Sequence, residues 1–300
     1  MNDTATPGTT ALPPGVEPGG RFDAWRPGPV AYVVCDVDGT LVGPEELASE
    51  EVVTAIARVQ EAGLRVGYAT GRMRDGVASL HRQLGASGPH VLHNGAEVRA
   101  DGTTIAAWSL RPDQVDALLA IAAEHDDLYL EVYAESGFRV SAWDERARAH
   151  WRILGVEPLG VITSAADLEA PAVPKATFVT FSDDAARWLL DRLRELDVEV
   201  GQAGSPLTPG MSFVNASRSG ATKGAALRRA AEHLGIGLDR VAAIGDAPND
   251  LSMLEVAGTA IAMGQAPPEV RAAAHLVVPE VGQHGVATAL DALREWSTAT

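Results

Sequence analysis

The sequence predicts an α/β fold in which a doubly wound parallel sheet is interrupted by a smaller α+β module. Three observations support this fold class. Short apolar, β-branched runs alternate with amphipathic helical patterns from residue 30 to Gly95. Hairpin-like and antiparallel patterns follow, and the alternation returns from Met211 to the end of the chain. Alternating strands and helices indicate a parallel sheet with helices on both faces.

The first α/β stretch begins with Val30–Cys35, whose continuous apolar character predicts a buried strand. Ser49 is a suitable N-cap for the helix that follows, and Gly63 suits the C′ position at its end. Further along, the patterns predict a strand at Leu64–Ala69, a helical stretch that ends at Leu84, and a third strand at Pro89–His93.

Residues 96–205 predict an α+β module on a mostly antiparallel sheet. The module begins with a β-hairpin whose two-residue turn is Asp101-Gly102. Helices are predicted next at Pro112–Glu124 and Asp184–Leu196. The predicted strands of the module are Leu128–Tyr133, Phe138–Ser141, Lys175–Phe181 and Val198–Val200.

The alternation of strands and helices then resumes. Helices are predicted at Thr222–Leu234, at Asn249–Val256 and at the end of the chain, and strands at Val241–Ile244, Thr259–Ala262 and Ala274–Val278. We therefore expect a Rossmann-like core over residues 30–95 and 206–300, with the inserted module over 96–205. Residues 1–29 mix Thr, Pro and Gly and predict a disordered tail.

The charge of the chain excludes several classes of partner. Its 300 residues contain 40 acidic and 24 basic side chains, for a formal net charge of −16. Such a surface repels phosphate backbones and anionic membranes, so neither nucleic acid nor membrane is expected as a partner. No apolar run approaches the roughly 20 residues of a membrane helix, and the N-terminus does not resemble a signal peptide. We expect a cytoplasmic protein, a monomer or homodimer, with a small-molecule partner.

The single cysteine, Cys35, excludes an internal disulfide framework and a Cys-rich zinc site. Cysteine-dependent phosphatases require an arginine six residues after the nucleophile, and Leu41 occupies that position. Cys35 lies in an apolar run, so it is predicted to be a small core residue.

The strongest chemical signal is Asp36-Val-Asp38-Gly-Thr at the carboxyl end of the first predicted strand. Ligand sites of open α/β sheets lie outside the carboxyl ends of the strands, so both carboxylates are expected at such a site. One alternative is a turn in which an Asp caps the following segment. A calcium loop is excluded, because twelve-residue numbering from Asp36 puts Leu47 where a bidentate Glu belongs.

A second acidic motif, Gly245-Asp246-Ala-Pro-Asn249-Asp250, follows another apolar strand. Together with the first motif it brings four carboxylates to one edge of the predicted sheet. Carboxylates that converge repel each other unless a cation neutralises them. Since the motifs offer only oxygen ligands, Mg²⁺ is the predicted cofactor.

Two further segments are suited to bind phosphate. Thr70-Gly71-Arg72 combines a hydroxyl, an unobstructed backbone and a guanidinium after the second strand. Lys223 opens a predicted helix, where its ammonium and the helix N–H groups could stabilise phosphoryl charge together. In isolation either segment reads more simply as an N-cap or a surface charge, and the neighbouring motifs favour the anion site.

These motifs, in this order, resemble those of the haloacid dehalogenase-like hydrolase superfamily over about residues 30–95 and 206–300. Ala69-Thr-Gly-Arg72, Asn94-Gly-Ala96 and Gly245–Asp250 resemble its Cof-like, type IIB branch. The inserted module lies between Thr70 and Lys223, where proteins of this branch carry a C2 cap domain.

The resemblance implies a phosphatase mechanism. Asp36 would attack phosphorus and form an aspartyl-phosphate, while Asp38 would protonate the leaving oxygen and then activate water. The residues implied to hold Mg²⁺ are Asp36, Asp38 through its backbone carbonyl, Asp246 and Asp250. Those implied to bind the phosphoryl group are Thr70, Gly71, Lys223 and Asn249.

The expected substrate is a small phosphorylated metabolite, in the first place a sugar phosphate. Residues that could contact its leaving group are Arg72, Asn94, Gly95 and Lys175. Three alternatives remain open: a mutase of the phosphomannomutase type, a phosphatase of flavin or pyridoxal-type phosphates, and a non-catalytic phosphate-binding protein. A mere binder does not need a nucleophile beside a proton donor, so Asp36 and Asp38 argue against the last alternative.

Overall fold

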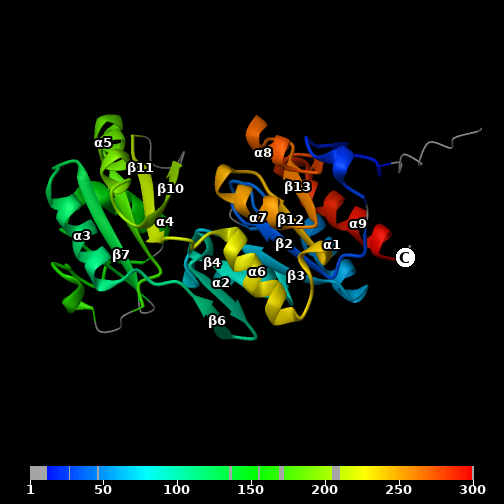
Figure 1. Cartoon of the computed structure of the whole chain (residues 1–300), viewed down its shortest axis with the longest axis horizontal. Helices are drawn as coiled ribbons and strands as arrows, with labels where there is room; N and C mark the ends of the chain where they lie inside the picture. The colour runs from blue at the N-terminus through cyan, green and yellow to red at the C-terminus, as the bar shows by residue number, and fades with distance from the viewer. Residues whose placement is uncertain are drawn as a thin grey trace, which may run out of the picture. The chain divides into compact units, whose positions relative to one another are not determined.

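The computed structural model describes residues 12–26, 28–45, 47–134, 137–154, 156–168, 172–204 and 210–298. The chain forms two compact units, and Figure 1 labels most of their helices and strands. The first unit comprises residues 1–67, 83–88 and 236–300, and the second comprises residues 68–82 and 89–235. The larger, nine-stranded sheet consists mainly of parallel strands that alternate with helices along the chain, which confirms the predicted α/β class.

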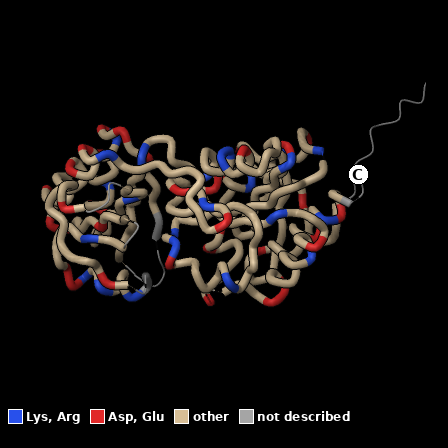
Figure 2. Tube along the Cα trace, turned by 90° about the horizontal axis from the view of Figure 1, so that it is seen from below, with Lys and Arg blue, Asp and Glu red and all other residues tan. Residues whose placement is uncertain are grey.

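Basic and acidic residues are interspersed along the described part of the trace (Figure 2). Acidic side chains are in excess, 40 against 24. A search of the described residues finds no helix that is both long and apolar enough to cross a bilayer.

The first unit contains a mostly parallel sheet with strand order β1-β14-β13-β12-β2-β3. Its strands are β1 (Glu17–Pro18), β2 (Tyr32–Asp36), the start of β3 (Arg65–Ala69), β12 (Val241–Gly245), β13 (Thr259–Met263) and β14 (Leu276–Val278). Its α-helices are α1 (Glu50–Glu61), α7 (Leu251–Val256), α8 (Pro268–Ala273) and α9 (Gly285–Thr298). Single 3₁₀ turns lie at Phe22–Ala24, Leu238–Arg240, Pro248–Asp250 and Val281–Gln283.

Strands β2, β12 and β13 are buried along their whole length. Continuous apolar runs of this kind are typical of parallel strands that are covered on both faces. The parallel register pairs Cys35 with Ile244, so Asp36 and Gly245 come at the same edge of the sheet. The two acidic motifs therefore follow their strands side by side.

Helix α1 begins and ends at the residues that the sequence predicts. The Ser49 hydroxyl accepts a hydrogen bond from the Val52 N–H at 3.4 Å, and Gly63 follows the C-cap with φ +92°. The buried side chains of α1 recur at helical spacing, at Val52, Ala55, Ile56 and Val59.

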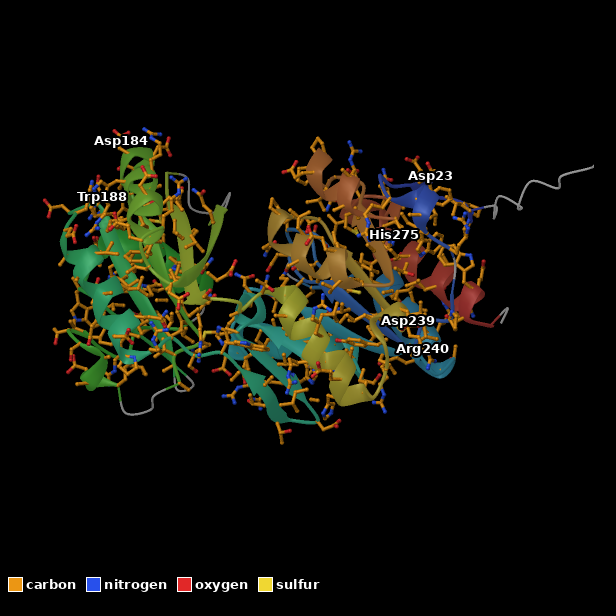
Figure 3. All side chains as sticks on the ribbon, viewed as in Figure 1. Asp23, Asp184, Trp188, Asp239, Arg240 and His275 are labelled. Atoms are coloured by element: carbon orange, nitrogen blue, oxygen red, sulfur yellow. The ribbon has the colours of Figure 1, made fainter. Side chains whose placement is uncertain are left out.

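The N-terminal segment differs from the predicted disordered tail. Residues 1–11 and 27 lie outside the described residues, but 12–26 are ordered. The short β1 pairs antiparallel with β14 and covers that sheet edge. Trp25, 5% exposed, donates its indole N–H to the Thr259 hydroxyl at 3.1 Å and stacks on His275, which is labelled in Figure 3. The strand pairing and the buried Trp25 attach this segment to the sheet despite its Pro- and Gly-rich composition.

The second unit contains the end of β3, which continues into the order β3-β4-β5-β6, and a separate antiparallel sheet with order β10-β11-β9-β7-β8. Its further strands are β4 (His90–Leu92), β5 (Glu97–Ala100), β6 (Thr103–Ala107), β7 (Leu128–Ala134), β8 (Gly137–Val140), β9 (Lys175–Thr180), β10 (Val198–Gly204) and β11 (Ser212–Arg218). Its α-helices are α2 (Ala78–Leu84, whose last residues belong to the first unit), α3 (Pro112–Ala123), α4 (Arg148–Leu154), α5 (Asp183–Leu193) and α6 (Lys223–Leu234). Short 3₁₀ turns lie at Asp75–Val77, His93–Gly95, Glu145–Ala147 and Ala165–Asp167.

Two segments have strand partners that the sequence grouping does not anticipate. The β5–β6 hairpin, grouped with the inserted module, pairs with β4 in the larger sheet. Strand β11, grouped with the core, pairs with β9 and β10 in the five-stranded sheet. Because strand partners are chosen by contacts between distant residues, chain order does not reveal them. As domain boundaries, 30–95, 206–300 and 96–205 stay a prediction.

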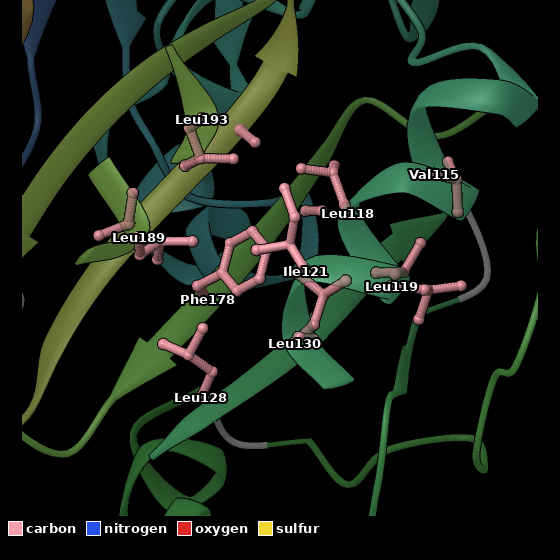
Figure 4. Packing of buried hydrophobic residues seen from close by; sticks show 14 of the residues in the cluster. Val115, Leu118, Leu119, Ile121, Leu128, Leu130, Phe178, Leu189 and Leu193 are labelled. Carbon is pink, nitrogen blue, oxygen red and sulfur yellow. The ribbon is translucent and has the colours of Figure 1, made fainter. Parts of the chain in front are cut away.

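The two faces of the five-stranded sheet differ in character, because side chains alternate along a strand. Leu128, Leu130 and Val132 of β7 join the apolar cluster that packs under α3 and α5 (Figure 4). Figure 4 shows Phe178 of β9 in the same cluster. The opposite face of β7 carries Tyr129, Glu131 and Tyr133.

Candidate functional site

Three carboxylates of the two acidic motifs come together in the first unit. Asp36, Asp246 and Asp250 each offer an oxygen that lies within 4.8 Å of the others. Asp36 is 5% exposed and Asp250 is fully buried. Negative charges this close, two of them buried, repel each other unless a cation is bound between them. The all-oxygen donor set fits a hard divalent cation such as Mg²⁺.

Asp250 also holds the loop after β12 in shape. Its Oδ2 accepts hydrogen bonds from the backbone N–H groups of Asp246 and Ala247, both at 3.0 Å. The loop is thereby closed on a buried carboxylate. Asn249, the neighbouring predicted site residue, is exposed on this turn.

The turn after β2 lies directly against Asp246. Gly39 has φ +87°, and a Cβ at this position would lie 2.3 Å from Oδ2 of Asp246, so another residue would strain the turn and displace that carboxylate. The Thr40 hydroxyl donates to Oδ1 of Asp246 at 3.1 Å. The Asp38 side chain is exposed and is not one of the three clustered carboxylates. Its predicted role in metal binding uses the backbone carbonyl.

Gln265 is a member of this group that sequence reasoning missed. Its side-chain N–H donates to the Gly39 carbonyl at 2.5 Å and to Oδ2 of Asp246 at 3.5 Å. Its side-chain oxygen accepts from the Val281 N–H at 3.2 Å. The signal that could have identified it is its place two residues after β13, the strand beside β12.

The second group of predicted residues lies in the second unit and begins with Thr70, which is fully buried. The Thr70 hydroxyl accepts the Arg72 N–H at 3.0 Å, and its carbonyl accepts the Asn94 N–H at 2.9 Å. A further bond joins the His93 N–H to the Arg72 carbonyl at 3.2 Å. These bonds tie the Thr70–Arg72 loop to the 93–95 turn.

That turn lies close to the start of α6. Gly95 has φ +110°, and a Cβ there would lie 2.2 Å from the carbonyl carbon of Thr222. Thr222 is the N-cap of α6 and accepts the Ala225 N–H at 3.1 Å. Lys223, the first helical residue, is 1% exposed. A buried ammonium at a helix N-terminus fits a site for an anion.

Lys175 joins this second group from β9. Its ammonium donates to the Gly71 carbonyl at 3.0 Å and lies 4.6 Å from the centre of the Tyr133 ring. Burial lowers the pKa of Lys175 to about 8, and the negative charge of Glu131 acts in the opposite direction. The Arg72 guanidinium donates to the Gly76 carbonyl at 3.3 Å.

The residues of the candidate site thus form two groups, one in each unit, and the sequence predicts all of them except Gln265. The first contains Asp36, Asp246 and Asp250, with Asp38, Gln265 and Asn249 on the adjoining turns. The second contains Thr70, Gly71, Arg72, Asn94, Gly95, Lys175 and Lys223. Their catalytic and binding roles stay predictions.

The predicted core position of Cys35 is confirmed, since its side chain is fully buried in β2. Burial, with the neighbouring Asp36 charge, raises the pKa of the thiol. We expect Ellman's reagent to react at least about 10³-fold more slowly with the native protein than with the protein in guanidinium, because the thiol is exposed only on opening. Equal rates in the two solutions would contradict a buried, inert Cys35.

A model of the haloacid dehalogenase-like hydrolase family matches residues 33–290 of the chain. The 5-amino-6-(5-phospho-D-ribitylamino)uracil phosphatase of Bacillus subtilis is 27% identical over 286 residues, which cover 87% of this chain and 97% of that protein. The HMP-PP phosphatase of Klebsiella pneumoniae is 29% identical over 243 residues, which cover 79% of this chain and 85% of that protein.

Among solved structures, a sugar phosphatase of HAD subclass IIB superimposes with a TM-score of 0.73 and 24% sequence identity. The match covers 87% of this chain and 98% of that chain. This likeness supports the fold.

Proposed function

This chain belongs to the haloacid dehalogenase-like hydrolase family, and we propose that it releases phosphate from a small phosphorylated metabolite with Asp36 as the nucleophile. It is an enzyme of the phosphatase class, like its named relatives. The observation that carries the proposal is the convergence of Asp36, Asp246 and Asp250 at the carboxyl ends of two paired parallel strands.

The reaction has two steps. A carboxylate oxygen of Asp36 forms a bond to phosphorus while the bond to the leaving oxygen breaks, and Asp38 gives its proton to that oxygen. A water molecule then attacks the aspartyl-phosphate, and Asp38 takes a proton from the water as the Asp36 carboxylate is released. The exposed position of Asp38 on a turn beside Asp246 suits a group that exchanges protons with substrate and water.

Mg²⁺ would be held by Asp36, the backbone carbonyl of Asp38, Asp246 and Asp250, and when bound it supplies positive charge that offsets the charge of the phosphoryl oxygens. Thr40 and Gln265 keep Asp246 in place through their hydrogen bonds. Asn249 is proposed to orient the loop or a phosphoryl oxygen.

Thr70, Gly71 and Lys223 are proposed to bind the transferred phosphoryl group, whose charge is spread over its equatorial oxygens. The buried Thr70, the tied loop and the buried ammonium of Lys223 support this role, because pre-positioned donors need no reorganisation during reaction. Arg72, Asn94, Gly95 and Lys175 are proposed to contact the leaving group.

The test is phosphate release from a panel of hexose, pentose, polyol, pyrimidine, flavin and pyridoxal phosphates, with Mg²⁺ or with EDTA. We expect a sugar-type phosphate to be hydrolysed with Mg²⁺, and EDTA to lower the rate at least about 10³-fold, because unscreened carboxylates repel the substrate dianion. Mg²⁺ added in excess over EDTA should restore the rate. A rate unchanged by EDTA, or no release from any compound by folded protein, would contradict the proposal.

A further inference from the structure

A fully buried carboxylate, Glu131, lies between Tyr129 and Tyr133 on the face of β7 that points away from the α3 and α5 cluster. It accepts hydrogen bonds from the Tyr133 hydroxyl at 2.6 Å and from the Trp151 indole N–H at 3.2 Å, and Nδ1 of His150 lies 3.0 Å from its Oε1. These partners satisfy the buried carboxyl group, and a carboxylate acceptor there pairs with the His150 tautomer that carries its proton on Nδ1. Nothing in the proposed reaction uses this group directly.

The carboxylate is connected to Lys175 through Tyr133. Tyr133 stands directly opposite Lys175 in the register of β7 and β9. The bond to Glu131 fixes the phenol, and the ammonium of Lys175 lies 4.6 Å from the centre of its ring. On its other side the ammonium donates to the Gly71 carbonyl at 3.0 Å. One continuous set of contacts therefore runs from Glu131 to the Thr70–Arg72 loop.

We propose that Glu131 is a positioning residue, which holds Lys175 as an ammonium against the Gly71 loop so that the lysine can serve the leaving group of the substrate. The last part of this inference rests on the function proposed above. An ammonium has three N–H donors, and Gly71 accepts one of them, so Lys175 can also offer a donor to an oxygen of the substrate.

The charges around Lys175 give Glu131 this role. Burial lowers the pKa of Lys175 to about 8, which is close to neutral pH. The negative charge of the Glu131 carboxylate counteracts this effect of burial. Tyr133 stays neutral, because burial and Glu131 raise its pKa. His93, in the turn after β4, also stays neutral, because burial and the charge of Lys175 lower its pKa to about 3. Removal of the Glu131 charge should therefore favour neutral Lys175.

The chain contains only two lysines, Lys175 and Lys223, so the titration can be observed directly. In protein labelled with ¹⁵N-lysine, Lys175→Arg assigns the two Nζ signals. We expect the Lys175 signal to titrate near pH 8 in the wild type, and at least about one unit lower in Glu131→Gln. The matched control is Glu124→Gln, which removes an exposed carboxylate paired with Arg192 and should leave the titration unchanged.

Because Glu131→Gln alters a buried site, Tyr133→Phe provides a second variant, which keeps the ring but loses the hydroxyl that donates to Glu131. The freed ring should broaden or shift the Lys175 signal, and backbone amide spectra report whether each variant folds. A Lys175 titration in both folded variants that equals the wild type would overturn the positioning role.

The pH dependence of kcat/KM tests the second part of the proposal. A one-unit fall in the pKa of Lys175 should move the alkaline limb to lower pH and reduce kcat/KM by about 8-fold at pH 8.5. A shifted NMR titration with an unchanged pH profile would overturn the link to substrate. If no compound is hydrolysed, the proposed function fails, while the NMR titration still decides the role of Glu131.

Discussion

Replacing Asp36 by Asn is expected to lower kcat at least about 10⁴-fold, because the amide has the shape of the carboxylate but cannot attack phosphorus. Removal of a single catalytic group from another hydrolase costs about 10⁴- to 10⁶-fold. Asp36 is 5% exposed at the end of β2, and the substitution creates no cavity there. The measurement is steady-state phosphate release with Mg²⁺ on the best substrate of the panel.

Thermal unfolding provides the control for this variant. Without metal, Asp36→Asn should unfold at the same temperature as the wild type or at a higher one, because one of three mutually repelling carboxylates is lost. Asp239→Asn, an exposed acid of the first unit labelled in Figure 3, should keep the wild-type rate. An Asp36→Asn protein that turns over at nearly the wild-type rate would refute Asp36 as the nucleophile.

The second large effect concerns stability. Gly95→Ala is expected to lower the free energy of unfolding by about 2–5 kcal/mol, from the strain of φ +110° and from overlap with the backbone. Its Cβ would lie 2.2 Å from the Thr222 carbonyl carbon and 2.7 Å from the Lys223 nitrogen. The 93–95 turn must then move away from the start of α6. Equilibrium urea unfolding measures the loss.

Gly235→Ala separates strain from overlap. Gly235 also has a positive φ, +68°, but a Cβ there would meet nothing within 4 Å. We expect this variant to lose only about 1 kcal/mol. The folded fraction of Gly95→Ala should also bind inorganic phosphate more weakly, because Thr70 and Lys223 are proposed to bind the phosphoryl group. Equal destabilisation by the two substitutions would show that the turn does not need its close approach to Thr222.

Much of the site could be predicted from the sequence because its signals are local. Asp36 and Asp246 each follow an apolar run by one or two residues, and parallel strands end at a common edge. The Ser49 cap and Gly63 likewise mark the ends of α1 through short-range hydrogen bonds and backbone conformation.

Other features could not be predicted, because their signal lies in contacts between distant residues. Gln265 carries no motif, and it joins the acidic group only because β13 pairs with β12. Trp25 looks like part of a disordered tail until Thr259 and His275 are placed beside it. In the sequence Glu131 looks like an ordinary strand residue. Only its contacts with His150 and Trp151 in the folded chain identify it as a buried, hydrogen-bonded carboxylate.

The sequence by itself determined the α/β class, the order of the motifs and the residues at the carboxyl ends of the strands, since periodicity and turn chemistry act over a few residues. Only the tertiary structure decided that the β5–β6 hairpin pairs with β4, that β11 joins the five-stranded sheet, and that Lys175 meets Gly71. Those pairings depend on which surfaces, distant in the sequence, are buried together. The free energy of that burial cannot be inferred from a short stretch of sequence.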